Sequence, residues 1–96
     1  MKIVIDIDGV ICEETKPYSR AKVIVGAADA LAFWKTCMGY TLILHTSRRE
    51  RDRKLTVKWL KDNNIIYDSL VMGKPKGDVY IDDKALKFNG IWDILL

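Results

Sequence analysis

The sequence has few of the cysteines and histidines that are typical of disulfide-rich secreted proteins and zinc-binding domains, and it has no long apolar run of the kind found in membrane proteins. Its 96 residues include only two cysteines, two prolines and one histidine. Cys12 and Cys37 are far apart and form no CxxC pair, which argues against a zinc site and is typical of a reducing compartment. No apolar run approaches the roughly 20 residues of a membrane span. The apolar N-terminal stretch carries acidic residues, which signal peptides lack, so we expect a cytoplasmic protein.

What is present is the composition of one small globular domain. Hydrophobic residues make up 49% and charged residues 30% of the chain, which excludes disordered and collagen-like proteins. We expect a single domain over residues 1–96, without repeats or linkers. The net charge of +3 accommodates a phosphate-bearing substrate but does not by itself indicate nucleic-acid binding.

Apolar runs alternate with helical patterns, which predicts an α/β fold. We expect a small three-layer Rossmann-like domain with a mostly parallel sheet of about four strands. The predicted strands are residues 2–7, 40–45, 67–72 and 79–81. The predicted helices are residues 26–38, with an apolar face of Ala27, Leu31, Trp34 and Met38, and 47–62, with an inner stripe of Leu55, Trp59 and Leu60. Residues 10–25 are predicted as a loop and residues 85–96 as a tail with a last helical turn.

The start of the second predicted helix has a specific signal. Ser47 and Glu50 have the S-x-x-E spacing of a capping box. In a capping box the two side chains bond each other's backbone N–H groups. The pattern therefore predicts that this helix begins directly after the second strand.

Polar side chains capable of phosphate chemistry cluster near the ends of the predicted strands. They are Asp6, Asp8, Thr46, Lys74, Asp82 and Asp83. The carboxyl ends of parallel strands meet at one edge of a sheet, where ligands bind. We therefore expect these residues to converge on one site, although they are far apart in the sequence.

The residue types at this edge indicate phosphoryl transfer. Four carboxylates repel one another unless a cation lies among them, and oxygen ligands favour Mg²⁺, which binds one or two carboxylates and substrate phosphate. Thr46, Lys74 and the N-terminus of the following helix would contact the phosphate. One aspartate can attack phosphorus, while a second acid protonates the leaving group.

Four segments, in order, resemble the motifs of the haloacid dehalogenase (HAD) superfamily. Residues 6–10 (DIDGV) resemble its DxDx[TV] signature, and residues 46–48 (TSR) are similar to its T-x-R form. Lys74 matches the lysine of the third motif, and residues 79–83 (VYIDD) resemble the fourth. The resemblance extends over roughly residues 1–86. The gaps between the motifs leave no room for a cap domain, so the chain looks like a near-minimal cap-less phosphatase.

The resemblance implies a Mg²⁺-dependent phosphomonoester hydrolase that forms an aspartyl-phosphate. Asp6 would be the nucleophile and Asp8 the general acid and base. The implied phosphate-binding residues are Thr46, Ser47, Arg48 and Lys74. The implied Mg²⁺ ligands are Asp6, Asp8 through its backbone carbonyl, and the pair Asp82 and Asp83.

Several points stay open at this stage. The substrate could be a sugar phosphate, a nucleotide or a nucleic-acid phosphate end, and a homo-oligomer could complete the edge of the site; no membrane partner is expected. The alternative function is a non-catalytic or phosphoacceptor signalling module on the same kind of fold. The order of the motifs, D-x-D, Thr, Lys and then D-D, favours the phosphatase, because a receiver module begins with its acidic pair.

Overall fold

Three parallel strands form the sheet. The computed structural model describes residues 1–93, with β1 (Lys2–Asp6), β2 (Thr41–His45) and β3 (Ser69–Val71) in the order β1-β2-β3. The register pairs Asp6 with His45 and His45 with Val71, so all three strands end at the same level. The predicted α/β, Rossmann-like class with a parallel sheet is thus confirmed.

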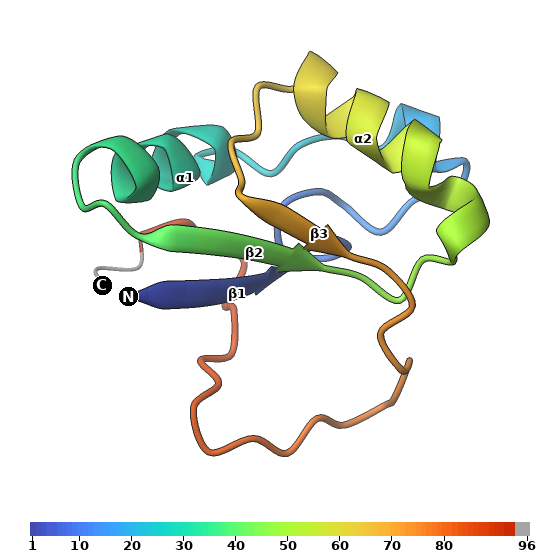
Figure 1. Ribbon diagram of the computed structural model, residues 1–96. Helices are drawn as coiled ribbons and strands as arrows, with labels where there is room; N and C mark the ends of the chain where they lie inside the picture. The colour runs from blue at the N-terminus through green and yellow to red at the C-terminus, as the bar shows by residue number, and fades with distance from the viewer. Residues whose placement is uncertain (94–96) are drawn as a thin grey trace.

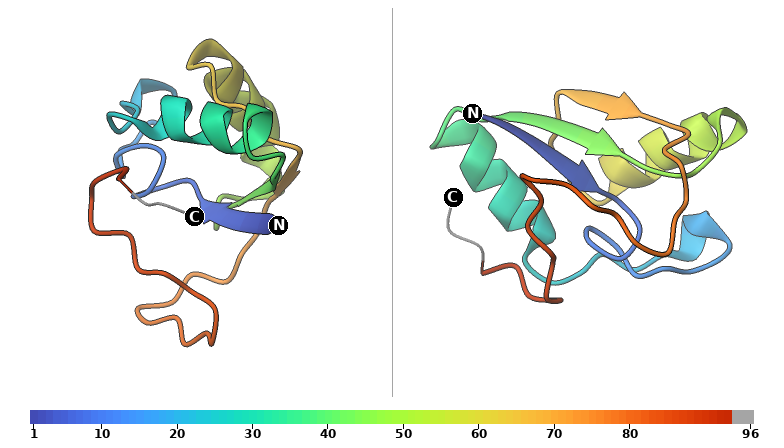
Figure 2. Two further views of the ribbon diagram at one scale, coloured as in Figure 1. Left: turned by 90° about the vertical axis from the view of Figure 1, so that its left-hand side faces the viewer. Right: turned by 90° about the horizontal axis from the view of Figure 1, so that it is seen from below.

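Both long helices cover one face of this sheet, so the described chain has two layers of regular structure rather than the predicted three. Helices α1 (Ala27–Thr36) and α2 (Arg53–Asp62) lie above the strands in Figure 1. The segment that follows β3 runs as irregular chain across the other side, as the rotated views of Figure 2 show. Two short 3₁₀ turns, η1 (Tyr18–Arg20) and η2 (Glu50–Asp52), complete the elements of the described chain. Within residues 1–93, no helix has the length and apolar character needed to cross a membrane.

The core lies between the sheet and the two helices. Ile5, Leu42 and Leu44 are buried on the helix-facing side of the strands. The predicted apolar face of α1 is confirmed at Ala27, Leu31 and Trp34, which are buried. Met38 is exposed, because it follows the end of the helix rather than lying on its inner face.

The second helix begins later than the capping-box pattern predicts. Residues 47–49 form no helix, and Arg49 has an extended backbone. The Glu50 carboxylate binds the Arg53 guanidinium at 2.7 Å instead of closing a capping box with Ser47. The backbone is held away from the helix by the carbonyl of Arg48, which accepts a hydrogen bond from the Gly73 N–H at 2.9 Å.

The inner stripe of α2 is also shifted from the predicted one. Trp59 and Leu60 are buried as expected, but Leu55 is exposed. Thr56 takes the inner position instead and is fully buried. Its hydroxyl accepts a hydrogen bond from the Arg48 guanidinium, which explains why a polar residue occupies this place.

The fourth strand predicted over residues 79–81 is not formed. Val79 and Ile81 are largely exposed, and the hydroxyl of Tyr80 bonds locally to the carbonyl of Pro75 and the N–H of Gly77. These short-range contacts hold the segment in an irregular path, and β1 remains an edge strand in the described sheet.

The tail forms no helical turn over residues 85–93, and the rest of the predicted tail, residues 94–96, lies outside the described chain. It nevertheless reaches the rim of the core. Trp92 packs edge-on against Trp34, with ring centroids 5.6 Å apart, and its indole N–H donates to the carbonyl of Val10 at 2.8 Å.

Candidate active site

The carboxyl edge of the sheet brings together Asp6, Asp8, Thr46 and Lys74, as the strand-end argument predicts. Asp6 is the last residue of β1, and its Oδ1 accepts the backbone N–H of Ile7 at 2.9 Å. Its other oxygen, Oδ2, lies 3.7 Å from the Nζ of Lys74. The Lys74 backbone N–H donates to the Thr46 carbonyl at 2.8 Å, which anchors the lysine loop to the end of β2. Asp6 therefore faces a cation while about a third of its side chain stays open to solvent.

The electrostatic setting of Asp6 is mixed. Burial raises the pKa of its carboxyl above the ordinary 3.8, while the charge of Lys74 and the Ile7 N–H work in the opposite direction. His45, the register neighbour of Asp6, has a pKa lowered by burial and by the charge of Lys74. A neutral imidazole beside the carboxylate leaves Lys74 as the main positive charge there.

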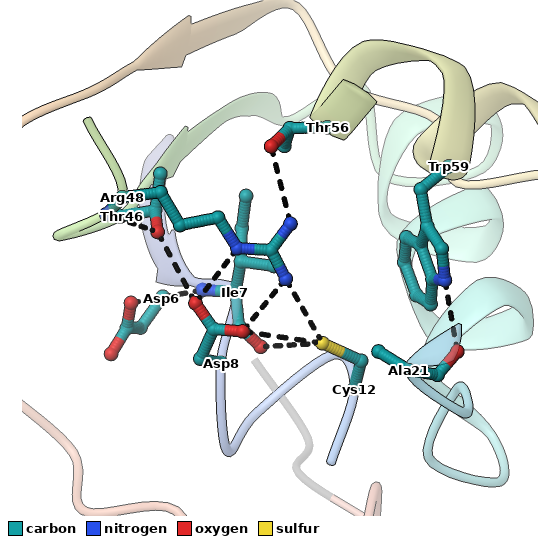
Figure 3. Close-up of polar contacts among 9 residues, drawn as sticks. All are labelled: Asp6, Ile7, Asp8, Cys12, Ala21, Thr46, Arg48, Thr56 and Trp59. Carbon is teal, nitrogen blue, oxygen red and sulfur yellow. Dashed lines mark hydrogen bonds and ion pairs between the residues drawn. The ribbon is translucent and has the colours of Figure 1, made fainter. Parts of the chain in front are cut away.

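Asp8 is held by a buried arginine. The Arg48 Nε lies 3.0 Å from Asp8 Oδ2, and its Nη2 lies 2.7 Å from Oδ1, which makes a two-pronged ion pair (Figure 3). The Arg48 side chain is fully buried, and the Asp8 side chain is 14% exposed. Hydrogen bonds of this kind stabilise the charged carboxylate and fix its orientation.

Further contacts lock the guanidinium in place. Its Nη1 donates to the hydroxyl of Thr56 at 3.1 Å, and its carbon lies 3.9 Å from the ring centroid of Tyr18. Burial would lower the pKa of Arg48, but the hydrogen bonds and charge of Asp8 outweigh it and raise that pKa. Arg48 was predicted to contact phosphate, yet the structure directs its guanidinium at Asp8 instead. The reason is the buried carboxylate, which needs a close counterion.

The two hydroxyl residues at the end of β2 occupy different places. Thr46 is fully buried; its Oγ1 accepts the Arg48 backbone N–H at 3.1 Å and lies 3.4 Å from Asp8 Oδ2. The hydroxyl thus joins the Asp8 network. Ser47 is only partly buried and lines a pocket beside Asp8, where it is open to a ligand.

Asp82 and Asp83 are not gathered with Asp6 and Asp8. Both are exposed, and Asp82 Oδ1 accepts the nearby Lys84 N–H at 2.8 Å. In the described residues, no three His, Cys, Asp or Glu side chains come together in a group that could hold a metal ion. The carboxylates in this arrangement therefore do not fit the predicted Mg²⁺ site, because the segment that should bring the acidic pair to the sheet edge forms no strand.

Cys12 borders the site but is no nucleophile. Burial, followed by the charge of Asp8, raises the pKa of its thiol to about 12, so the reactive thiolate is scarce at neutral pH. Its Sγ lies 3.8 Å from Arg48 Nη2 and packs under the ion pair.

The sequence alone did not reveal the residues that support Arg48. Tyr18 lies in the loop before α1, and Thr56 looks like an ordinary helical residue. A polar residue on the inner side of an apolar helix stripe is the one signal that could have pointed to Thr56.

Comparison with known proteins connects this chain to a described domain family. The family model for the LNS2 domain of PITM 1-3 matches residues 3–94, which is nearly the whole chain. No curated protein sequence matches it.

Solved structures share the fold. A structural-genomics target from Vibrio cholerae is 21% identical, with a TM-score of 0.75 over 90% of this chain and 82% of that one. A chain in the structure of a Pnkp1/Rnl/Hen1 complex is 29% identical, with a TM-score of 0.64 over 85% of this chain. A chain of the Pnkp1/Rnl/Hen1 RNA repair complex is also 29% identical, over 82% of this chain. The matched regions are only 30% and 27% of those two longer chains.

Proposed function

The chain belongs to the LNS2 domain family, which has a HAD-like phosphatase fold, and from this premise we propose that it is a phosphomonoester hydrolase acting through an aspartyl-phosphate on Asp6. One observation carries the proposal. Asp6 is a partly exposed carboxylate at the carboxyl edge of the sheet, and its Oδ2 lies 3.7 Å from the ammonium group of Lys74. A nucleophile beside a positive charge is what attack on a negatively charged phosphoryl group requires.

The proposed reaction has two displacements. A carboxylate oxygen of Asp6 forms a bond to phosphorus as the bond from phosphorus to the ester oxygen breaks. Asp8 gives a proton to that oxygen, which requires that its carboxyl, paired with Arg48 in the structure, first takes up a proton from water. Water then attacks the phosphorus of the aspartyl-phosphate, and Asp8 takes a proton from it, which releases inorganic phosphate and restores Asp6.

Lys74 and Ser47 are assigned to the phosphoryl oxygens. Lys74 balances their charge, and Ser47 offers a hydroxyl beside Asp8. Thr46 and Arg48 act one step further away, because both bond the Asp8 carboxylate. Their role in this proposal is to aim Asp8 at the ester oxygen.

The remaining expectations belong to the same proposal. Mg²⁺ dependence stays a prediction from the motif resemblance, and the two displacements at Asp6 do not include the ion. A domain without a cap and a cytoplasmic location also stay proposals. They follow from the short gaps between the motifs and from the two widely spaced cysteines, which are typical of a reducing compartment.

The test is phosphate release from p-nitrophenyl phosphate, with Mg²⁺ and with EDTA, by the wild-type chain and by Asp6→Asn. The amide keeps the shape of Asp6 but cannot attack phosphorus, so turnover should fall to background. Lys61→Met, on the exposed side of α2, is the matched surface control and should retain full activity. A wild-type chain without turnover, or an Asp6→Asn variant that retains it, would overturn the proposal.

A further inference from the structure

A small pocket opens beside Asp8. Its cavity volume is about 210 Å³. It is lined by Asp8, Glu14, Thr15, Lys16, Tyr18, Ser47 and Lys76. Asp6 and Lys74 do not line it. If phosphate is held at Asp6 and Lys74 with a contact to Ser47, as the proposed function requires, the pocket adjoins it through Asp8 and Ser47, which both belong to its lining.

Every residue of the lining carries a polar or charged group. The lining combines carboxylates, which accept hydrogen bonds, with lysines, which donate them, and with hydroxyls, which do both. Within residues 1–93, Lys16 and Lys76 form no ion pair, so their ammonium groups are available to a ligand. In the described part of the chain, no Val, Leu, Ile, Met or Phe lines the pocket, so an alkyl group would displace water from these charged groups and gain only the lysine stems and the Tyr18 ring as apolar surface.

The pocket also lacks a platform for a flat ring. Tyr18 is its one aromatic side chain among the described residues, and one face of that ring is covered by the Arg48 guanidinium at 3.9 Å. The cavity is smaller than the roughly 300–1,000 Å³ of sites that enclose drug-sized ligands. The pocket therefore offers a nucleoside base no pair of aromatic rings to stack between.

We infer that this pocket binds the leaving group of the substrate, and that the leaving group is a small polyhydroxylated unit, a sugar or polyol. Each hydroxyl of such a group donates one hydrogen bond and accepts others, which matches a lining of mixed charge and hydroxyls. The inference rests on the proposed function and adds the substrate class to it.

Matched pairs of esters test this substrate class. Phosphate release is measured for glycerol 3-phosphate against n-propyl phosphate, and for mannitol 1-phosphate against n-hexyl phosphate, with adenosine 5′-monophosphate as the nucleotide. The hydroxylated member of each pair should have a kcat/KM at least about tenfold higher. The reason is that the alkyl analogue leaves the polar groups of the pocket without hydrogen-bond partners. The nucleotide should be hydrolysed more slowly than mannitol 1-phosphate.

Two pocket variants locate the preference. Lys16→Met and Glu14→Gln, both at exposed positions, should lower the ratio of hydroxylated to alkyl ester about three- to tenfold. Lys61→Met serves as the matched control and should leave the ratio unchanged. Equal turnover of the paired esters, faster turnover of the nucleotide, or pocket variants that behave like Lys61→Met would overturn the inference while the phosphatase stands. Absence of release from every ester, including p-nitrophenyl phosphate, would instead overturn the proposed function and the inference with it.

Discussion

At the residue scale, the two aspartates of the DxD motif have different surroundings. About a third of the Asp6 side chain is exposed, and the ammonium group of Lys74 lies at ion-pair distance from it rather than in hydrogen-bond contact. Asp8 is nearly enclosed and held by both nitrogens of one edge of Arg48. The environment thus separates a carboxylate that can approach a substrate from one whose position is fixed.

The burial of Asp6 has a consequence for stability. Since its pKa is raised in the folded chain, the folded state binds the proton more tightly, and stability is lost as the pH rises from the ordinary 3.8 through the raised value. At neutral pH, Asp6→Asn should therefore raise the melting temperature by a few degrees at most, because partial exposure screens the charge. The gain should disappear below pH 3.8, where the wild-type carboxyl is also neutral. Thermal unfolding across the pH range measures it; a variant less stable than wild type at neutral pH would contradict the account.

The Asp8–Arg48 pair predicts strong coupling. Asp8→Asn and Arg48→Met should each cost about 3–5 kcal/mol of unfolding free energy, because each leaves the other group buried without its counterion. The double variant should cost clearly less than the sum of the two. Urea unfolding of the three variants measures this coupling, with Lys58→Met, which breaks an exposed pair with Asp62, as the mild control. Additive losses would show that the two side chains do not depend on each other.

At the scale of elements, the sheet edge was predictable, whereas the path of the chain beyond it was not. Three strands and both helices follow from periodicity, and the convergence of Asp6, Asp8, Thr46 and Lys74 follows from parallel topology alone. The late start of α2 did not follow, since the capping-box pattern is local. Tertiary contacts override the local pattern. The Arg48 side chain turns inward to pair with Asp8, and residues 47–49 therefore stay outside the helix.

The failure of the fourth strand has the same origin. The apolar sequence of residues 79–81 satisfies the strand pattern. A sequence pattern does not show, however, whether the segment pairs with the free edge of a neighbouring strand. The irregular path before Tyr80 is held by hydrogen bonds that join residues three and five positions apart. Such contacts carry no signal in hydrophobic periodicity.

The exposed path of this segment gives a direct test. Ile81 is 97% exposed, so Ile81→Ser should change the free energy of unfolding by less than about 0.5 kcal/mol. Ile5→Ala, at a core position of β1, should cost about 2–5 kcal/mol in the same experiment. A loss of comparable size from Ile81→Ser would indicate that the segment docks against the sheet after all.

At the scale of the whole molecule, the core between the sheet and the two helices is made of apolar side chains that pack on one another. Burial of such side chains stabilises a fold without help from a metal ion. We therefore expect EDTA to leave the melting temperature of the chain unchanged. Calorimetry with and without the chelator measures this, and a marked fall in the melting temperature would reveal a structural metal site. Turnover under the same two conditions separately decides the predicted Mg²⁺ dependence.

The central claim is that phosphate passes through Asp6, and a chemical trap tests it most directly. Sodium borohydride reduces an aspartyl-phosphate to homoserine but leaves an ordinary aspartate intact. The wild-type chain, quenched during turnover of p-nitrophenyl phosphate and reduced, should yield a peptide with homoserine at position 6, and the sample without substrate should not. Reduction at another aspartate, or an unmodified Asp6 in a chain that releases phosphate and is quenched while the intermediate is present, would contradict the account.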